Sequence, residues 1–329
     1  MFKIKPKISD VAKAAGVSPT TVSRVMNKRG YISEETRQKV YDAMKKLNYI
    51  PNDLARSLYN KRSNLIGLIV PTTANPFYGE LTARIEHFCA LAGLKVLLCN
   101  SLHNAEKEAH YWEMLRRNQV DGVIVCTYNR GLIDVSEQMP TVAFDHYLSS
   151  GIPVISSDNY AGGELAAATL IEAGCKSIVH INGPAELETP ANLRRSGYEA
   201  VMQRYGLPAM TYEIRSVLSQ AEAEAAICTL FDQQPQMDGV FASDDSIALK
   251  VIQEARRRNK RVPEDVKVIG YDGTEFVRQH VPELTTIKQP MITMAETAVQ
   301  LLIQQIEQPD KALEKEYVHN IELVRGNSV

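Results

Sequence analysis

Four short hydroxyl side chains and one arginine stand close together near the N-terminus, in the decamer Gly16-Val17-Ser18-Pro19-Thr20-Thr21-Val22-Ser23-Arg24-Val25. Hydroxyl and guanidinium groups hydrogen bond to base edges in the major groove of DNA, and an arginine can bind O6 and N7 of guanine together. Val22 and Val25 are three residues apart, which favours burial of one helix edge and exposure of the polar groups. The alternative is an ordinary helical hairpin with a solvated polar face.

Two short helices are needed to position these side chains. Ser9 can cap a first helix through Val11, which Gly16 ends. Ser18 can cap a second helix that has Pro19 at its first position, where the missing N–H costs nothing. Two such helices joined by a three-residue turn are typical of a helix-turn-helix.

A third helix completes this small domain. Ser33 is its expected cap, two glutamates occupy its first turn, and Val40, Met44 and Leu47 share one face. The pattern predicts an all-α, three-helix headpiece over residues 1–49.

Charge is distributed unevenly along the chain. Residues 1–63 hold 14 Lys and Arg against 5 Asp and Glu, whereas the other residues hold 23 against 34, so the net charge of −2 hides a basic head on an acidic body. A basic head attracts DNA phosphates whatever the sequence, and predicts an affinity that falls steeply with salt.

Length and composition bound the class of protein. A chain of 329 residues predicts two or three domains. No charged start precedes an apolar stretch and no apolar run approaches a membrane span, so we expect a cytoplasmic protein without membrane contact. The five cysteines are widely spaced without metal or disulfide patterning, and buried reduced thiols are expected at Cys89, Cys99, Cys126, Cys175 and Cys228.

Residues 50–63 separate the headpiece from the rest of the chain. Pro51 blocks continuation of the third helix, Asn52 can cap a new one, and about two turns follow before the basic linker Lys61-Arg62. A helix this short is marginal in water by itself, so it should fold only when something packs on it. We therefore expect a hinge helix that can act as a switch.

From residue 64 onward apolar strands alternate with amphipathic helices. Such alternation predicts parallel sheets covered on both faces, and nine strands fit two doubly wound halves better than one sheet. The expected strands are 65–70, 95–99, 122–126, 141–144, 152–156, 177–181, 239–242, 266–270 and 285–288, and the clearest helices are 78–92, 105–118, 163–173 and 193–205.

The order of head, short helix and body resembles the lactose/galactose repressor family over the whole chain. Signature segments of that family have counterparts in the decamer and in Asn52-Asp53-Leu54-Ala55-Arg56-Ser57-Leu58, Asn75-Pro76-Phe77-Tyr78, Val120-Asp121-Gly122, Ser243-Asp244-Asp245, Ile269-Gly270-Tyr271-Asp272-Gly273 and Leu284-Thr285-Thr286-Ile287. Three segments look most like the sucrose-operon repressors of Gram-positive bacteria: Gly30-Tyr31-Ile32-Ser33-Glu34-Glu35-Thr36, Ser156-Ser157-Asp158-Asn159 and Tyr271-Asp272-Gly273-Thr274.

The resemblance implies a homodimeric transcriptional repressor whose headpieces enter major grooves of a near-palindromic operator. By position, Thr20, Thr21 and Arg24 correspond to base-reading residues, and Ser18, Ser23 and Asn27 to phosphate contacts. Pro19 departs from the family, where a side chain able to reach a base is common. Leu58 corresponds to a minor-groove wedge, the alternative being a helix residue packed on its partner, and such a wedge kinks DNA. The other DNA-contacting positions implied are Tyr49, Asn52, Ala55 and Arg56.

The resemblance also implies a periplasmic-binding-protein-like core over 64–329, with subdomains of about 64–158 with 290–318 and 159–289 with 319–329. Its effector would be held by polar groups at strand ends and by an aromatic face, as doubly wound sheets place ligands. The candidate residues are Asn75, Phe77, Tyr78, Cys126, Asp145, Arg194, Ser243, Asp244, Asp272 and Gln289. Asp145 and Asp272 could instead cap turns, and Asp244 could steady a loop.

The expected function is a repressor of a carbohydrate operon, most similar to those for sucrose, that a small sugar relieves allosterically. The effector would be sucrose, fructose or a phosphorylated form, with no cofactor, metal or catalytic residue. A carbon-catabolite regulator with a phosphocarrier protein as corepressor, and a purine-type corepressed regulator, are the alternatives. A nucleotide-dependent enzyme is disfavoured because neither a Gly-x-Gly-x-x-Gly nor a Gly-Lys-Ser/Thr phosphate loop occurs, and a transport receptor because of the basic head. Dimers, not tetramers, are expected, with apolar positions near 78–91 and 111–115 suited either to the interface or to packing on the sheet.

Overall fold

A computed structural model describes residues 6–27, 29–50, 62–127, 139–149, 151–185, 189–214 and 220–329. The chain divides into two compact units, residues 1–63 and 64–329, which are considered separately below. The predicted hinge positions Asn52, Ala55, Arg56 and Leu58 lie outside the described residues.

The first unit contains three helices, α1 (Ile8–Ala15), α2 (Pro19–Met26) and α3 (Glu34–Leu47). Gly16 ends α1 with φ 67°, and the Ser18 hydroxyl caps α2 by accepting the Thr21 N–H at 3.1 Å. The Ser33 hydroxyl caps α3 in the same way. Val22 and Val25 are buried with Val40 in a small apolar core. The predicted headpiece and the caps of its second and third helices are confirmed.

The predicted cap of the first helix is wrong. The helix begins at Ile8, before Ser9, and Lys7 occupies the N-cap position. The Lys7 N–H donates to the Asp10 carboxylate at 2.7 Å, which closes the first turn two residues earlier than a Ser9 cap would.

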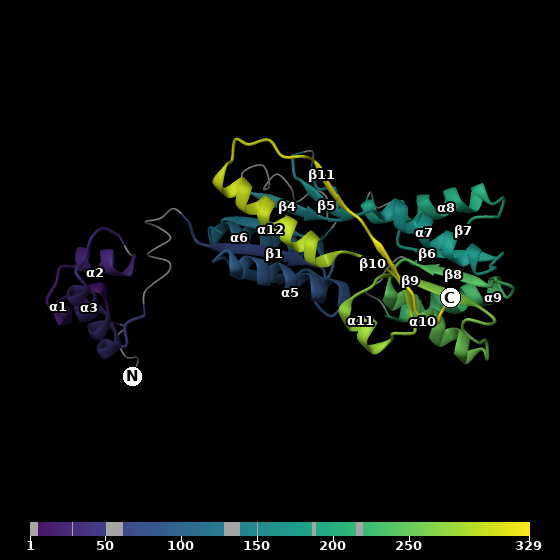
Figure 1. Cartoon of the computed structure of the whole chain (residues 1–329), viewed down its shortest axis with the longest axis horizontal. Helices are drawn as coiled ribbons and strands as arrows, with labels where there is room; N and C mark the ends of the chain where they lie inside the picture. The colour runs from purple at the N-terminus through teal and green to yellow at the C-terminus, as the bar shows by residue number, and fades with distance from the viewer. Residues whose placement is uncertain are drawn as a thin grey trace. The chain divides into compact units, whose positions relative to one another are not determined.

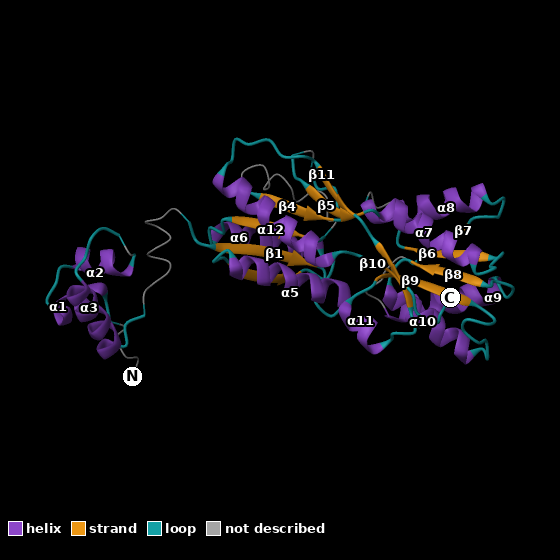
Figure 2. Ribbon diagram, in the orientation of Figure 1, coloured by secondary structure: helices purple, strands orange, loops and turns teal. Residues whose placement is uncertain are grey.

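The second unit contains two six-stranded sheets (Figures 1 and 2). The first has the order β11-β5-β4-β3-β1-β2 and all its strands are parallel. Its strands are β1 (Leu65–Val70), β2 (Lys95–Asn100), β3 (Gly122–Val125), β4 (Thr141–Phe144), β5 (Val154–Ser157) and β11 (Glu316–His319). We call this sheet and the helices that cover it the first lobe.

Helices cover both faces of the first sheet. On one face α5 (Pro76–Leu91) and α12 (Met291–Glu307) pack over residues such as Leu68 and Ile124. On the other face α6 (Ala105–Arg117) packs Trp112 and Leu115 over Val123. The apolar residues of α5 and α6 that were candidates for a subunit interface are largely used in this helix-on-sheet packing.

The second lobe is built on the second sheet, of order β12-β10-β9-β8-β6-β7. Its strands are β6 (Ile178–Asn182), β7 (Met210–Glu213), β8 (Gly239–Ala242), β9 (Lys267–Asp272), β10 (Thr285–Lys288) and β12 (Glu322–Val324). Helices α7 (Asn159–Glu172) and α8 (Leu193–Arg204) cover one face. Helices α9 (Gln220–Gln233), α10 (Asp245–Arg257) and α11 (Glu275–His280) cover the other. A short 3₁₀ turn, η2 (Pro190–Asn192), precedes α8.

Two doubly wound sheets are therefore confirmed, with one difference. The edge strand β12 pairs antiparallel to β10, so the second sheet is mixed. The chain reaches it directly from β11 of the first sheet, and only two residues separate the two strands.

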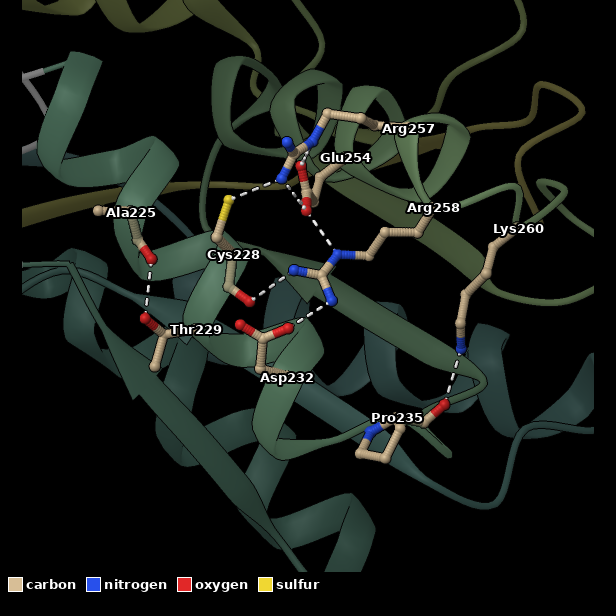
Figure 3. A network of polar contacts seen from close by, with 9 residues as sticks. All are labelled: Ala225, Cys228, Thr229, Asp232, Pro235, Glu254, Arg257, Arg258 and Lys260. Atoms are coloured by element: carbon tan, nitrogen blue, oxygen red, sulfur yellow. Dashed lines mark hydrogen bonds and ion pairs between the residues drawn. The ribbon is translucent and has the colours of Figure 1, made fainter.

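Helices α9 and α10 are joined by a network of ion pairs (Figure 3). The Glu254 carboxylate forms ion pairs with two guanidinium groups, those of Arg257 and Arg258. The distance from Glu254 Oε2 to Arg257 Nε is 2.7 Å. Arg258 also pairs with Asp232 at 2.6 Å and donates to the Cys228 carbonyl at 3.2 Å. The network holds the two helices together at the outer surface of the second lobe.

No helix in the described ranges is both long and apolar enough to cross a membrane. All five cysteines are free thiols, and four of them are buried.

Candidate ligand cleft and DNA-contacting helix

A cavity of about 160 Å³ lies between the two lobes of the core. Most of its polar wall comes from the carboxyl ends of parallel strands, the place where doubly wound sheets bind ligands. Residues from the first lobe that line it are Asn75, Phe77, Tyr78, Asp145 and His146, and those from the second lobe and its crossover are Asn182, Gly183, Pro184, Thr189, Ala191, Asn192, Arg194, Ser243, Asp244, Asp272 and Gln289.

Arg194 is the cation of this wall and is only 6% exposed. Its Nε donates to Asn159 Oδ1 at 2.7 Å and its Nη1 donates to the Ser243 carbonyl at 2.6 Å. The guanidinium carbon lies 3.6 Å from the centre of the Tyr271 ring. These contacts fix the plane of the guanidinium and leave Nη2 without a hydrogen bond among the described residues.

Two glycines let Arg194 come this close. Helices α7 and α8 cross where a Cβ on Gly163 would lie 2.0 Å from the Arg194 carbonyl oxygen. A Cβ on Gly197 would lie 2.1 Å from the Tyr160 carbonyl oxygen. Only glycine permits the backbones to approach to this distance, and the first turn of α8 is thereby pressed against α7.

Asp145 follows strand β4 and Asp272 is the last residue of β9, and both have left-handed backbone conformations, with φ of 51° and 102°. Few residues other than glycine adopt such values, and aspartate is among the exceptions. Burial raises the pKa of Asp145 to about 6 although Arg194 and a hydrogen bond from Asn159 oppose the shift. Burial also raises the pKa of Asp272 well above its ordinary value, again against the attraction of Arg194.

Asp244 and Asp245 stand side by side at the start of α10 and have different contacts. Asp244 lines the cavity and caps the helix by accepting the Ile247 N–H at 2.7 Å. Asp245 faces inward, where it accepts from the Thr286 hydroxyl and from the Gly273 N–H at 2.9 Å. Burial raises the pKa of Asp245 to about 7. The loop-steadying role considered for Asp244 is therefore real, and it coexists with a place in the wall.

Gln289 follows β10 and connects the lobes at the cavity. Its Nε2 donates to Asp272 Oδ1 at 2.8 Å, and its backbone N–H donates to the Asp272 carbonyl at 3.0 Å. Its Oε1 is buried without a hydrogen-bond partner among the described residues. A hydrogen-bond acceptor is thus available at the wall.

The aromatic side of the cavity comes from the first turn of α5. Asn75 caps this helix by accepting the Phe77 N–H at 2.9 Å. Phe77 and Tyr78 contact each other edge to face, with ring centres 5.2 Å apart. Phe77 also packs into the core of the first lobe, so Tyr78 is the more exposed of the two rings.

The structure does not bring Cys126 to the cavity. This thiol is 1% exposed and packs with Ile124 and Phe144 in the core of the first lobe. Burial, with Asp145 nearby, raises the pKa of its thiol. Successive side chains point to opposite faces of a sheet, and at Cys126 the side chain points to the apolar face.

Several residues of the wall were missed by sequence reasoning. Asn182 ends β6 and donates to Asn192 Oδ1 at 3.0 Å, and Asn192 in turn donates to the Pro184 carbonyl. These contacts shape the loop before α8. The segment Asn182-Gly183-Pro184 has the sequence of an ordinary turn. Its position at the end of an apolar strand is the signal that could have assigned it to the cavity wall. His146 also lines the cavity, and burial lowers its pKa to about 3.

An ion-pair clasp, made of Glu80, Arg84 and Glu275, joins the lobes outside this cavity. Arg84 Nη2 lies 2.8 Å from Glu275 Oε2 and 3.5 Å from Glu80 Oε1. The Glu275 N–H donates to Glu80 Oε2 at 2.6 Å. Because Glu80 and Arg84 belong to α5 and Glu275 to α11, the clasp spans first and second lobes.

The headpiece exposes the predicted DNA-contacting groups of α2. Ser18, Pro19, Thr20 and Arg24 are exposed, whereas Thr21, Ser23, Asn27 and Tyr49 are partly buried. Arg24 makes no ion pair with the described residues of its unit. The Thr21 hydroxyl is within 2.9 Å of the Ser18 hydroxyl, and Asn27 Nδ2 donates to Ser23 Oγ at 3.3 Å. One face of α2 is therefore polar and open.

Comparison with known proteins places both units in described families. Residues 7–52 match bacterial regulatory proteins of the lacI family, and residues 167–329 match a periplasmic binding protein-like domain. The sucrose operon repressor of Pediococcus pentosaceus is 44% identical over 324 residues, which are 98% of this chain and 99% of the relative.

Two further similarities cover almost as much of the chain. The ribose operon repressor of Halalkalibacterium halodurans is 40% identical over 306 residues, or 91% of this chain and 90% of the relative. The crystal structure of the lac repressor dimer bound to operator and the anti-inducer ONPF is 26% identical, covers 99% of both chains and superposes with a TM-score of 0.86.

Proposed function

This chain belongs to the lacI family of bacterial regulatory proteins and is a DNA-binding transcriptional repressor; we propose that it controls sucrose utilisation and that a small sugar in the cleft relieves repression. Sucrose, fructose and their phosphorylated forms are the effectors we consider. The protein acts in the cytoplasm, with the bacterial chromosome. The 44% identity to a sucrose operon repressor over almost the whole chain is the observation that favours sucrose.

The open polar face of α2 supports base reading by this headpiece. Thr20 and Arg24 are exposed on one helix whose opposite edge is buried through Val22 and Val25. Arginine suits guanine, and threonine offers both a hydroxyl and a methyl group to thymine. Pro19 has no hydrogen-bond donor, so the first turn of α2 has fewer side chains that can hydrogen bond to bases.

The repressor acts as a homodimer on a near-palindromic operator, in this proposal. The lac repressor structure that resembles this chain is a dimer on its operator. Three large apolar side chains of the first lobe are solvent-exposed in the single chain: Leu91 is 72% exposed, Leu98 41% and Leu102 55%. They lie at the end of α5, on the edge strand β2 and in the turn after it, and exposed apolar groups of this kind mark contact surfaces.

Relief of repression requires the cleft to communicate with the DNA-binding segment. The cavity is lined by both lobes, so a ligand that contacts both favours one lobe arrangement over the other. A coupling of roughly 1–3 kcal/mol is typical between allosteric sites and would change DNA affinity about 5- to 150-fold.

Mobility shift on two-fold symmetric DNA tests the proposal. We expect the full chain to prefer one palindrome over random DNA, and to release it when sucrose, fructose or one of their phosphates is added. Tightened binding with a phosphocarrier protein would instead favour the carbon-catabolite alternative, and tightened binding with a purine the purine-type one. Equal affinity for the palindrome and for random fragments, with and without these compounds, contradicts the proposal.

Replacement of Arg24 separates base reading from charge. Arg24→Ala should weaken binding to the matched operator by about 1–3 kcal/mol and relax one base position. Arg117→Ala, which removes an exposed arginine of the core unit, serves as the control and should leave both properties unchanged. An equal loss on random DNA would make Arg24 a phosphate contact.

A further inference from the structure

The wall of the cleft has more acidic than basic groups. Among the described residues that line the cavity, Asp145, Asp244 and Asp272 are acids and Arg194 is the one base that is charged near neutral pH. His146 lines it too, but burial lowers the pKa of His146 to about 3 and leaves it neutral. A fourth acid, Asp245, lies directly behind the wall.

Arg194 is already engaged by the protein. Two of its nitrogens bind Asn159 and the Ser243 carbonyl, and one face lies on Tyr271. A phosphate is usually held by an arginine through two parallel hydrogen bonds, and often by more than one cation. The bond from Nε to Asn159 occupies the fork formed by Nε and Nη2, so Arg194 meets a ligand with the remaining N–H groups of Nη1 and Nη2 and is the one cation of the described wall.

The wall offers several hydrogen-bond acceptors to a ligand. The oxygens of Asp145 and Asp272 accept hydrogen bonds, and Gln289 Oε1 is buried without a partner. Sugar hydroxyls supply the matching donors and bring no charge. A phosphate group brings two negative charges and acceptor oxygens into a wall that has three acidic side chains and one cation among its described residues.

The cavity is also small. Its volume is about 160 Å³. Cavities for drug-sized ligands begin at about 300 Å³. One sugar ring with its hydroxyls suits this space, and a second ring does not.

We propose that the cleft binds a neutral, unphosphorylated monosaccharide and rejects both sugar phosphates and disaccharides. This inference rests on the proposed function, because it names the effector class of the same cleft. In a sucrose-responsive repressor the effector is then a monosaccharide component of sucrose and not sucrose itself.

Titration calorimetry on the full chain without DNA tests the inference. The probes are D-fructose, D-glucose and D-ribose, the phosphate esters of each, sucrose and D-glucosamine. We expect at least one of the three neutral sugars to bind at least 100-fold more tightly than its own phosphate ester and than sucrose. Binding of a phosphate ester within 10-fold of its parent sugar, tightest binding of sucrose or glucosamine, or no binding of any neutral sugar would each overturn the inference.

A charge variant tests the electrostatic cause. Asp244→Asn removes one carboxylate, and asparagine still caps a helix, so α10 should stay intact. The affinity for the phosphate ester should rise at least fivefold relative to the affinity for the neutral sugar. Asp265→Asn, which removes an acid paired with Arg261 away from the cavity, is the control and should leave the ratio unchanged. An unchanged ratio in Asp244→Asn would overturn the electrostatic argument, and Asp145→Asn replaces it if the first variant misfolds.

Mobility shift with the same probes separates this inference from the proposed function. Calorimetric binding of a neutral sugar that leaves operator binding unchanged would contradict the proposed function and retain the inference. Release of the operator by a phosphate ester, with the neutral sugar inactive, would overturn the inference and leave the repressor function intact.

Discussion

Substitution of Gly163, which does not itself line the cavity, by alanine should disrupt the cleft. The new Cβ would lie 2.0 Å from the Arg194 carbonyl oxygen, and ordinary contacts begin near 3.4 Å. The atom in the way belongs to the backbone, so no side chain can rotate to make room. Helix α8 must then move away from α7 by about 1 Å, and Arg194 moves with its first turn.

The size of the effect follows from what this movement breaks. Overpacking a well-packed contact costs about 1–3 kcal/mol. Loss of one buried hydrogen bond to the guanidinium, from Nε to Asn159 or from Nη1 to the Ser243 carbonyl, adds about 1.5–3 kcal/mol. We therefore expect a loss of about 2.5–6 kcal/mol in unfolding free energy, or a fall in Tm of roughly 4–11 °C.

Thermal unfolding and calorimetric sugar binding measure the two consequences. Gly163→Ala should lower the Tm and weaken sugar binding at least tenfold. Gly151→Ala is the matched control, because a Cβ there has no neighbour within 4 Å, and its unfolding free energy should change by less than about 0.5 kcal/mol. If Gly163→Ala melts and binds sugar like the parent protein, the helices do not cross as closely as described and the reasoning is refuted.

Three other predictions concern pH, lobe contact and the C-terminal segment. Because the folded pKa of Asp145 is raised to about 6, its stabilising contribution is full below about pH 4 and lost as pH rises through 6. Asp145→Asn should thus flatten the stability curve over that interval by about 3 kcal/mol, and an unchanged curve in chemical denaturation would contradict this. Glu275→Gln weakens the ion pair of the clasp with Arg84. It should change sugar affinity up to about fivefold, since a partly exposed ion pair contributes about 0.2–1 kcal/mol. An unchanged affinity in calorimetry would mean that the clasp does not influence how the two lobes are arranged. Ser328→Ala leaves the buried Thr285 N–H without its acceptor at 2.8 Å and should cost about 1–3 kcal/mol by denaturation, whereas a neutral result would mean that water replaces the hydroxyl.

Local signals in the sequence were sufficient for most of the fold. Helix caps such as Ser18 and Ser33 and the apolar strands of both sheet centres depend on neighbours in the chain, and they were predicted at or near their observed positions. The edge strands β7, β11 and β12 were not among the predicted strands. Their residues are half-buried or exposed, and their pairing depends on partners that lie far away in the sequence.

The cleft illustrates the same limit. Polar residues at the carboxyl ends of strands, such as Asp145 and Asp272, could be placed at the cavity because parallel strands end at one edge. Cys126 follows a strand too, yet it faces the apolar side, and that choice depends on the register of the strand. The network around Arg194 could not be predicted, since Asn159 and Tyr271 meet it through the tertiary fold.

Strands β11 and β12 have a consequence for biosynthesis. They follow each other within residues 316–324, yet one completes the first sheet beside β5 and the other completes the second beside β10. A nascent chain that stops before residue 316 therefore lacks an edge strand in both lobes at once, and each unfinished edge presents unpaired backbone groups. Such a truncated product would expose two aggregation-prone sheet edges to the proteases and chaperones of the cell. Because each lobe needs residues from both ends of the core, no contiguous fragment of the gene encodes one complete lobe.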